Sequence, residues 1–375
     1  MIKLLGIGLI AYLLFIAQRR LYEKLWQKHL GISLSFGTNH IFEGEQGELR
    51  EIIENRKRLP LSMLKVKFKT DRHLIFGNEK GSRTTDQYYR NDVFRISGGE
   101  RVTRTLRFTG GKRGYYTIDE ISLVASDLFF LGQMVADQPV RAELYVYPKP
   151  YDSRRLRQSF VQLNGEMLTR RHLLEDPFEY RGIREYQPYD DMRSINWKAT
   201  AKTGDFKVNQ MGYTSLKSVR IFFNIQDDNI LKKEEAVEMS LRIVVSLCLH
   251  FLQQGMQISC YGNGVDILTH QPLSVDGKAS EGQMDFIYRA LARIDTAQPT
   301  AGFVETFEEK LFQESKGAYT CFVAPNRYDD FVALLDRYEE TGNPFTWFYP
   351  VLGNKEPELP PELQGSVREI CLRAG

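Results

Sequence analysis

The sequence is poor in cysteine and has almost no net charge. Its 375 residues include four cysteines, which are widely spaced and form no CxxC or Cys/His cluster, so neither a zinc site nor a disulfide framework is indicated. The formal charge of +2 provides no overall field that would draw in nucleic acid or an anionic substrate. The HxE, HExxH, GxSxG and Walker sequences of common catalytic sites are missing. We therefore expect buried, reduced thiols, no cofactor and no metal.

An uncharged run of fourteen residues, Leu4–Ala17, lies near the N-terminus. As a helix it would rise about 21 Å, against about 30 Å for the hydrocarbon core of a bilayer, so spanning needs local thinning, with Lys3 and Arg19 reaching the headgroups. A cleaved signal peptide would need small residues after the run, where Arg19 and Arg20 stand. A helix lying in the membrane interface or buried in the protein is the other alternative.

Residues 1–28 are therefore predicted to be an anchor helix with a basic flank, held in the lipid bilayer through residues 2–18. One base precedes the run and several follow it, and positively charged flanks stay on the cytoplasmic side. The prediction is a single-pass protein of the cell membrane with its soluble domains in the cytoplasm. The bases that follow the run are Arg19, Arg20, Lys24 and Lys28.

Residues 31–150 alternate between apolar and polar side chains in short stretches. The breakers "SGGE" and "GGKRG" separate these stretches, and no long helical stripe interrupts them. This pattern predicts an antiparallel β-sandwich. The clearest strands are Leu64–Thr70, Arg101–Thr109, Tyr115–Ser126 and Ala142–Pro150.

From residue 217 to residue 375 predicted strands alternate with predicted helices. Ser218–Gln226 is typical of a buried strand, and Gln257–Leu268 predicts two strands around a tight turn at Gly262, Asn263 and Gly264. The alternation predicts an open, mostly parallel sheet, in which ligands bind beyond the carboxyl ends of the strands. The other expected helices are one with Glu234 and Glu235 in its first turns and Ile243–Leu252 as its middle, and those at Met284–Ile294, Val304–Gln313 and Asp329–Glu340. Further strands are expected at Ala318–Ala324, Phe345–Val351 and Val367–Leu372.

Residues 151–216 contain a dense mixture of charged and aromatic side chains. Asp190 or Asp191 could begin a helix that Gly204 ends, and this helix would carry one apolar face at Ile195 and an opposite one at Trp197. We therefore expect the segment to be packed between the two domains, with Trp197 buried. Its charges should neutralise one another, for example Arg184 or Arg193 with Asp190 or Asp191.

Two other interpretations of the charged segment remain open. A hydrolase or metal-dependent enzyme could use Asp190, Asp191 and Asp205 as acid, base or metal ligands, although no nucleophile accompanies them. A nucleic-acid surface would need unpaired bases, yet acids and bases are equal in number from residue 176 to residue 211. We therefore expect no nucleic acid among the partners.

The run Phe178–Gly204 resembles the signature of the bacterial domain of unknown function 58 family. "IFEGEQGEL", "SDLFFLG" and "LYVYPKP" also resemble parts of that family's sandwich, whereas Tyr189 stands where the family has glycine. The signature matches at Gly182, Arg184, Tyr186, Asp190, Asp191, Arg193, Ile195, Trp197, Ala199, Thr200 and Ala201.

The resemblance implies an N-terminal membrane region, an immunoglobulin-like sandwich and a von Willebrand factor A-like α/β domain. It also implies partners, because similar proteins are encoded beside MoxR-type AAA+ ATPases and transglutaminase-like membrane proteins. The hypothesis is a membrane-anchored, non-enzymatic adapter or scaffold that acts through protein-protein contacts.

The metal site of a von Willebrand factor A domain is degenerate in this sequence. Such a domain carries D-x-S-x-S after its first strand, where hard oxygen ligands hold magnesium. The leading carboxylate and both serines are missing here, and Pro325 and Asn326 stand where a later acidic ligand is expected. We expect no metal at this position, which could still bind a partner. The residues concerned are Asn224, Gln226, Asp227 and Asp228.

Overall fold

The computed structural model divides into two compact units, Met1–Lys149 and Pro150–Gly375. It describes residues 2–77, 82–84, 87–173, 175–213, 218–227, 234–277, 282–296, 300–313, 318–343, 345–351 and 368–373. Each unit has its own sheets and its own hydrophobic core.

The first unit begins with helix α1 (Ile2–Leu25), which was predicted to be a membrane anchor. Among the described residues, no helix is long and apolar enough to cross a lipid bilayer. The predicted location as a single-pass protein of the cell membrane is therefore wrong. The physical reason is that the uncharged run is short and the helix continues through charged residues such as Arg19 and Arg20. Its last turn packs on the sandwich, where Tyr22 and the following Trp26 are buried.

The rest of the first unit is a β-sandwich, as predicted. One sheet has the order β1-β3-β8-β5 and the other β2-β10-β9-β4-β7-β6, and all neighbours are antiparallel except β2 and β10. Apolar and polar side chains alternate along these strands, so every second side chain points inward. The inward side chains of both sheets pack into one hydrophobic core. The first sheet contains β1 (Leu30–Phe36), β3 (Gln46–Asn55), β8 (Arg101–Gly110) and β5 (Leu74–Phe76), and the second contains β2 (His40–Phe42), β10 (Gln133–Tyr147), β9 (Gly114–Ser126), β4 (Leu61–Asp71), β7 (Gln87–Ile96) and β6 (Ser82–Thr84).

The sandwich also buries a small group of charged side chains. Asp92 accepts from Arg90 Nε at 2.8 Å and pairs with Arg104 Nη1 at 2.9 Å. Glu51 lies opposite Arg104 in the register of β3 and β8, and it is fully buried with neither carboxylate oxygen hydrogen-bonded. Burial and the nearby Asp92 carboxylate raise the pKa of Glu51 to about 8.

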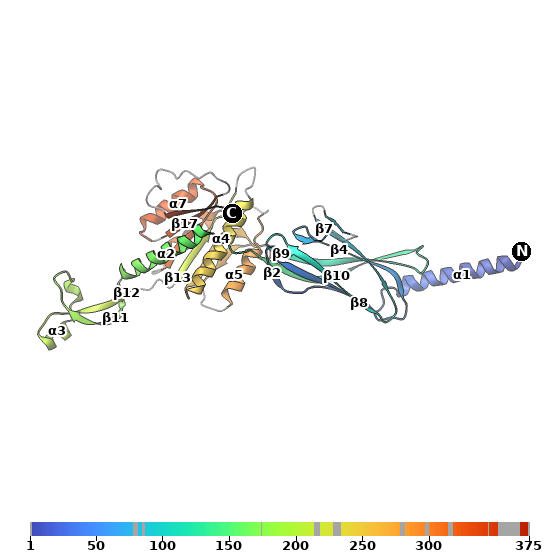
Figure 1. Ribbon diagram of the computed structural model, residues 1–375, viewed down its shortest axis with the longest axis horizontal. Coiled ribbons are helices and arrows are strands. Elements are labelled where there is room, and N and C mark those ends of the chain that lie inside the picture. The colour runs from blue at the N-terminus through green and yellow to red at the C-terminus, as the bar shows by residue number, and fades with distance from the viewer. Residues whose placement is uncertain are drawn as a thin grey trace. The chain divides into compact units, whose positions relative to one another are not determined.

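The second unit contains a sheet in the order β15-β14-β13-β16-β17-β18. The pairs are parallel except β14 with β15, which confirms the predicted mostly parallel sheet. Helices lie on both of its faces (Figure 1). The strands are β13 (Ser218–Phe223), β14 (Gln257–Val265), β15 (Pro272–Val275), β16 (Ala318–Val323), β17 (Phe345–Val351) and β18 (Arg368–Arg373), and the helices around them are α4 (Glu234–Gln253), α5 (Gln283–Ala292), α6 (Phe303–Phe312) and α7 (Asp329–Glu340).

Successive side chains of these strands point to opposite faces of the sheet, and each face packs against its own hydrophobic core. Phe222 and Phe322 face α6 and α7 in an aromatic core that includes Trp347. On the opposite face, Cys248 of α4 lies beside Cys260 and Cys321. These three cysteines are free and buried, as predicted; Cys371 lies outside the described side chains.

The predicted tight turn at Gly262, Asn263 and Gly264 is wrong, because these residues belong to strand β14, which continues to Val265. A Cβ atom at Gly262 would lie 2.0 Å from Cζ of Phe223 on the adjacent strand. The glycine therefore allows a close approach between strands and does not mark a turn.

Helix α2 (Arg154–Leu173) and the two-stranded sheet of β11 (Glu175–Glu185) and β12 (Lys207–Tyr213) complete the second unit. Ser153 Oγ accepts from Leu156 N at the start of α2, and Leu156, Leu163 and Met167 are buried. Neither α2 nor the β11-β12 hairpin was predicted from the sequence.

Candidate functional site: the hairpin tip and a strand-end amide cluster

Residues 182–210, the end of the hairpin with its long closing loop, are here called the hairpin tip. β11 and β12 are antiparallel, and the register shifts on either side of Tyr180. Ile195 bridges Val208, and both side chains are buried, so they form a small core for the tip. Tyr186 N donates to Phe206 O at 2.9 Å, which closes the loop.

A short helix, α3 (Trp197–Thr203), lies within this loop. Asn196 caps it by accepting from Ala199 N at 2.9 Å, and Gly204 ends it with a φ of +81°. Thr200 Oγ1 accepts from Lys207 N at 3.0 Å, which ties the helix to β12. The prediction of a helix starting at Asp190 or Asp191 is wrong, because a 3₁₀ turn, Met192–Ser194, and the Ile195 bridge come first.

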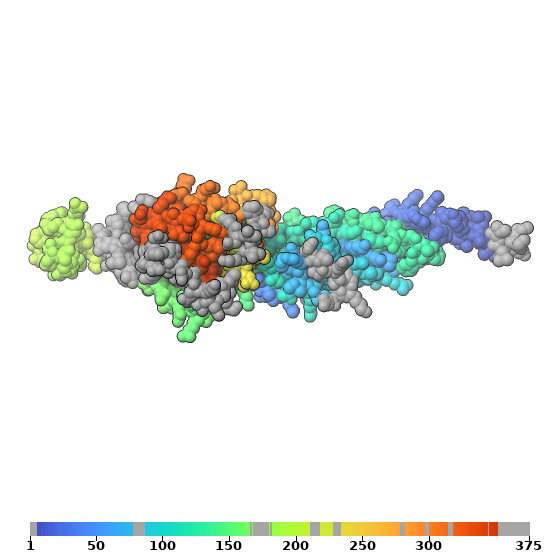
Figure 2. Space-filling model, turned by 90° about the horizontal axis from the view of Figure 1, so that it is seen from above, coloured from blue at the N-terminus to red at the C-terminus, as the bar shows by residue number. Residues whose placement is uncertain are grey.

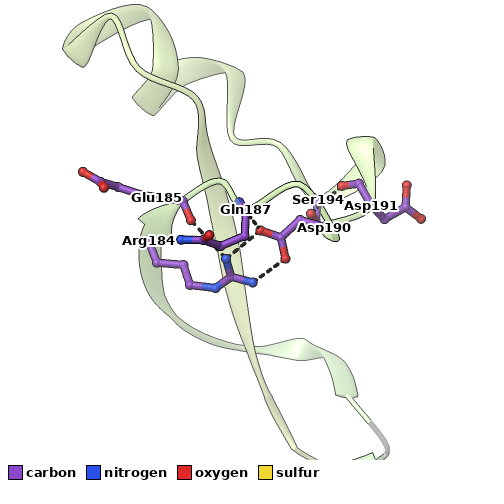
Figure 3. Close-up of polar contacts among 6 residues, drawn as sticks. All are labelled: Arg184, Glu185, Gln187, Asp190, Asp191 and Ser194. Atoms are coloured by element: carbon purple, nitrogen blue, oxygen red, sulfur yellow. Dashed lines mark hydrogen bonds and ion pairs between the residues drawn. The ribbon is translucent and has the colours of Figure 1, made fainter.

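Arg184 and Asp190 form a two-point ion pair that braces the tip (Figure 3). The two N–O distances are both 2.6 Å, and Asp190 Oδ2 also accepts from Gln187 N at 2.7 Å. The hydrogen bond from Arg184 lowers the pKa of Asp190, with a further contribution from Gln187 N. This pairing was predicted from the density of opposite charges in the sequence.

The remaining carboxylates of the tip do not form a catalytic set. Asp191 caps the 3₁₀ turn by accepting from Arg193 N at 2.9 Å, and Figure 3 shows its side chain pointing away from Asp190. Asp205 is exposed. Across the described residues, no group of three or more His, Cys, Asp or Glu side chains could hold a metal ion.

Trp197 is 63% exposed, so the prediction that it is buried between two bodies is wrong. Its ring centroid lies 6.5 Å from that of Phe206, and Phe206 lies 6.0 Å from Tyr186. α3 has no buried residue: its contact with β12 through Thr200 and Lys207 leaves Ala199 and Thr200 only half-buried. We call Tyr186, Trp197 and Phe206 the aromatic cluster. Tyr189, at 82% exposed, and Met192, at 61%, belong to the same loop.

The space-filling view in Figure 2 shows the tip, in light green, with no described segment covering the side in view. Lys198 and Lys202 are exposed one helical turn apart on α3, next to Trp197 and Ala201. Arg193 is also exposed, and its side chain makes no ion pair with any described residue. Gly182 lies on β11 with open space around it.

A second group of predicted residues meets at the carboxyl ends of β13, β14 and β16. Asn263 Nδ2 donates to Asn224 Oδ1 at 2.7 Å, and Asn263 Oδ1 accepts from Ile225 N at 2.9 Å. Asn224 Oδ1 also accepts from Gln226 N at 3.0 Å, and Asn326 Nδ2 donates to Gln226 O at 2.6 Å. We call Asn224, Asn263 and Asn326 the amide cluster.

The amide cluster uses its oxygens to fix the loop. Asn224 and Asn263 are buried, and their side-chain oxygens are already accepting hydrogen bonds. Both side chains are neutral amides, whereas Mg²⁺ is usually bound through carboxylates. Gln226 and Asp227 lie half-buried at the same edge, and Asp228 is outside the described residues.

Asn196, Phe206 and Asn263 are the site residues that the sequence analysis missed. Asn196 had a recognisable signal, because asparagine directly before an apolar helical residue is a common N-cap. Phe206 and Asn263 had none, since their roles depend on residues brought close only by the fold.

Comparisons with known proteins do not place this chain in a family. No family model matches this chain, and no curated protein matches it. Among solved structures, it is similar to a non-cellulosomal cohesin from Archaeoglobus fulgidus, with 10% identity, a TM-score of 0.20, and coverage of 31% of this chain and 90% of that one. It is also similar to a type II cohesin domain from the cellulosome of Acetivibrio cellulolyticus, with 11% identity, a TM-score of 0.23, and coverage of 30% and 94%. At such scores these likenesses carry no argument about function.

Proposed function

We propose that this chain is a non-enzymatic adapter that binds another protein through its hairpin tip. The observation that carries the proposal is the exposed aromatic cluster, with Trp197 63% and Phe206 54% exposed. Exposed groups of large apolar side chains mark interaction surfaces, and Trp and Tyr are enriched among residues that dominate binding energy. The family resemblance implies the same class of function, but the sequence pattern predicted a buried Trp197, which is wrong.

The bracing of the tip supports the proposal. The ion pair of Arg184 with Asp190 and the tie of Thr200 to Lys207 fix the loop that carries the aromatic cluster. A surface that is already ordered loses less conformational entropy when it binds, so more of its contact energy appears as affinity.

The resemblance to the domain of unknown function 58 family suggests which partner to test first. We propose that the chain is a member of this family, that its second unit has the von Willebrand factor A-like architecture, and that a MoxR-type AAA+ ATPase is the partner. The amide cluster supports a metal-independent form of this unit, because its oxygens are occupied. The enzyme alternative has less support, because Asp190 and Asp191 hold the loop in place.

Site-specific photo-crosslinking tests the proposal. A photoreactive residue would replace Trp197 or Phe206, and a matched control would replace Val161, which is 73% exposed on α2 of the same unit. We expect one defined protein, identified by mass spectrometry, to be crosslinked at both tip positions and not at the control. Adducts that are absent from the tip, or the same at all three positions, would contradict the proposal.

A further inference from the structure

The outer face of the β1-β3-β8-β5 sheet contains a hollow of about 850 Å³. It is formed by side chains that alternate outward from two neighbouring antiparallel strands, β3 and β8. Ile52, Thr103 and Thr105 supply apolar and hydroxyl groups to it. The charged residues that line it are Glu48, Arg50, Arg101 and Arg107.

The charges of this arginine hollow are only partly balanced. Glu48 is its single acid, and it lies 3.5 Å from Arg50 Nη2 and 4.0 Å from Arg107 Nε. These are long, solvent-exposed contacts, of the kind that contributes little to stability. Glu54 lies opposite Arg101 in the register and makes its ion pair with Arg56, so Arg101 receives only a weaker electrostatic contribution from Glu54. The hollow therefore has two more positive than negative groups, with their forked donors exposed.

The arginines are spaced along the strands in a way that fits an extended chain. Arg50 lies opposite Thr105 in the register, four residues along β8 from Arg101, and Arg107 lies six residues from Arg101. At about 3.3 Å per residue these separations are about 13 Å and 20 Å. An extended peptide has the same rise per residue as a strand. Three acidic residues, the second and third of them four and six positions after the first, would therefore reach the three guanidinium groups.

We propose that the arginine hollow binds an acidic, extended peptide segment of a partner protein. Guanidinium groups bind carboxylates with two parallel hydrogen bonds, and a ligand carboxylate can approach more closely than Glu48 does. The threonine hydroxyls between the arginines can bond to the backbone or to hydroxyl side chains of the peptide. This site is in the first unit and does not depend on the function proposed for the hairpin tip.

A labelled nine-residue peptide, capped at both ends, tests the proposal. It carries glutamate at positions 2, 6 and 8 and serine elsewhere, and fluorescence anisotropy measures its Kd for the full chain at low salt. The comparison peptide has the same composition with its glutamates at positions 4, 5 and 6. The protein variants are Arg101→Gln, Arg50→Gln and their combination. Arg141→Gln is the matched control, because Arg141 is an exposed arginine elsewhere in the sandwich.

We expect each single variant to weaken binding of the spaced peptide about two- to fivefold, and the double variant about tenfold, because exposed ion pairs are individually weak. Arg141→Gln and Trp197→Ala should leave the Kd unchanged, so this test and that of the hairpin tip can fail separately. The double variant Arg50→Lys/Arg101→Lys should keep part of the affinity, because charge remains while the forked geometry is lost. An unchanged Kd in the double glutamine variant overturns the proposal. Equal or tighter binding of the clustered peptide, or of an oligonucleotide of the same charge, overturns it as well.

Discussion

The guanidinium group of Arg184 holds both carboxylate oxygens of Asp190, and the same carboxylate accepts from the backbone N–H of Gln187. One ion pair thereby connects β11 to the start of the loop that carries Trp197. The side chain of Asp190 is 9% exposed and that of Arg184 is 40% exposed, so the carboxylate has little water available as a replacement partner.

The first prediction concerns this pair. Asp190→Asn should speed amide hydrogen exchange across residues 182–210, because the ion pair and the contact with Gln187 N are weakened. In the unchanged protein, the lowered pKa of Asp190 means that its stabilising effect is present above the usual value of 3.8 and is lost as the pH falls through the lower folded-state pKa. Mass spectrometry of exchanged peptides measures the effect.

Arg193→Gln is the matched control for that experiment. Arg193 is exposed and its side chain has no ion pair with a described residue, so exchange in the tip should be unchanged. The charge pattern alone predicts a loss of protection in this variant, because Arg193 is one of the bases expected to pair with Asp190 or Asp191. Equal exchange rates for Asp190→Asn and the unchanged protein would show that the ion pair does not order the loop.

The second prediction compares two tryptophans of the second unit. Trp347 is fully buried and donates to Ala324 O at 3.3 Å, so Trp347→Ala should lower the free energy of unfolding of this unit by about 3–5 kcal/mol. Trp197→Ala should change it by less than about 0.5 kcal/mol, because the indole is mostly in water. Urea unfolding followed by far-ultraviolet circular dichroism measures both. A large loss from Trp197→Ala would mean that the indole is covered.

The difference between these tryptophans shows what could be predicted from the sequence. Helix α7 was predicted with its correct ends, because Asp329 and Asp330 start it and Gly342, with a φ of +71°, follows it. Those signals are local. Whether an aromatic residue is buried depends instead on which distant segments of the chain pack against it. The spacing of Ile195 and Trp197 fits a buried helix as well as an exposed tip.

Two other misses have different causes. Helix α2 could have been found, because Leu156, Leu163 and Met167 recur at helical spacing. The path of β14 through Gly262 could not, since glycine followed by asparagine is a common turn signal and only the ring of Phe223 on a distant segment decides otherwise.

The third prediction concerns Glu51. The pKa of this buried carboxyl is raised to about 8 from 4.5, so the folded state binds its proton more tightly than the unfolded chain does. The contribution of this group to the free energy of unfolding is therefore largest below a pH of about 4.5. It decreases as the pH rises towards about 8. The glutamine of Glu51→Gln carries no charge at any of these pH values. The variant should therefore not show the decrease in the free energy of unfolding, on the order of a few kcal/mol, that the unchanged protein shows across this range.

Trp26 provides the signal for that measurement, because it is buried in the sandwich core. Urea unfolding from pH 5 to pH 9 would be followed by its fluorescence, with Trp197 and Trp347 both replaced by phenylalanine. Glu48→Gln is the control, since Glu48 is exposed at the surface of the same strand. If Glu51→Gln and the control show the same dependence on pH, the buried carboxyl is not the cause.

The fourth prediction concerns the amide cluster. Asn263→Ala removes the acceptor of Ile225 N and a donor to Asn224 Oδ1, and it should cost about 1–3 kcal/mol for each buried group left unsatisfied. Asn343→Ala, at an exposed position, should cost less than about 0.5 kcal/mol. Urea unfolding of the two variants checks the difference. Adding magnesium should change neither value, and stabilisation by magnesium would reveal a metal site that the amides were inferred to replace.

The central claim is that the aromatic cluster of the hairpin tip binds a protein partner, and titration calorimetry tests it most directly. The partner identified by crosslinking, or a MoxR-type AAA+ ATPase as the first candidate, would be titrated into the unchanged chain, Trp197→Ala and Val161→Ala. The account predicts that Trp197→Ala weakens the Kd by about thirtyfold or more, as expected for a dominant interface tryptophan, and that Val161→Ala leaves it within about twofold. Equal affinities for all three proteins would contradict the claim.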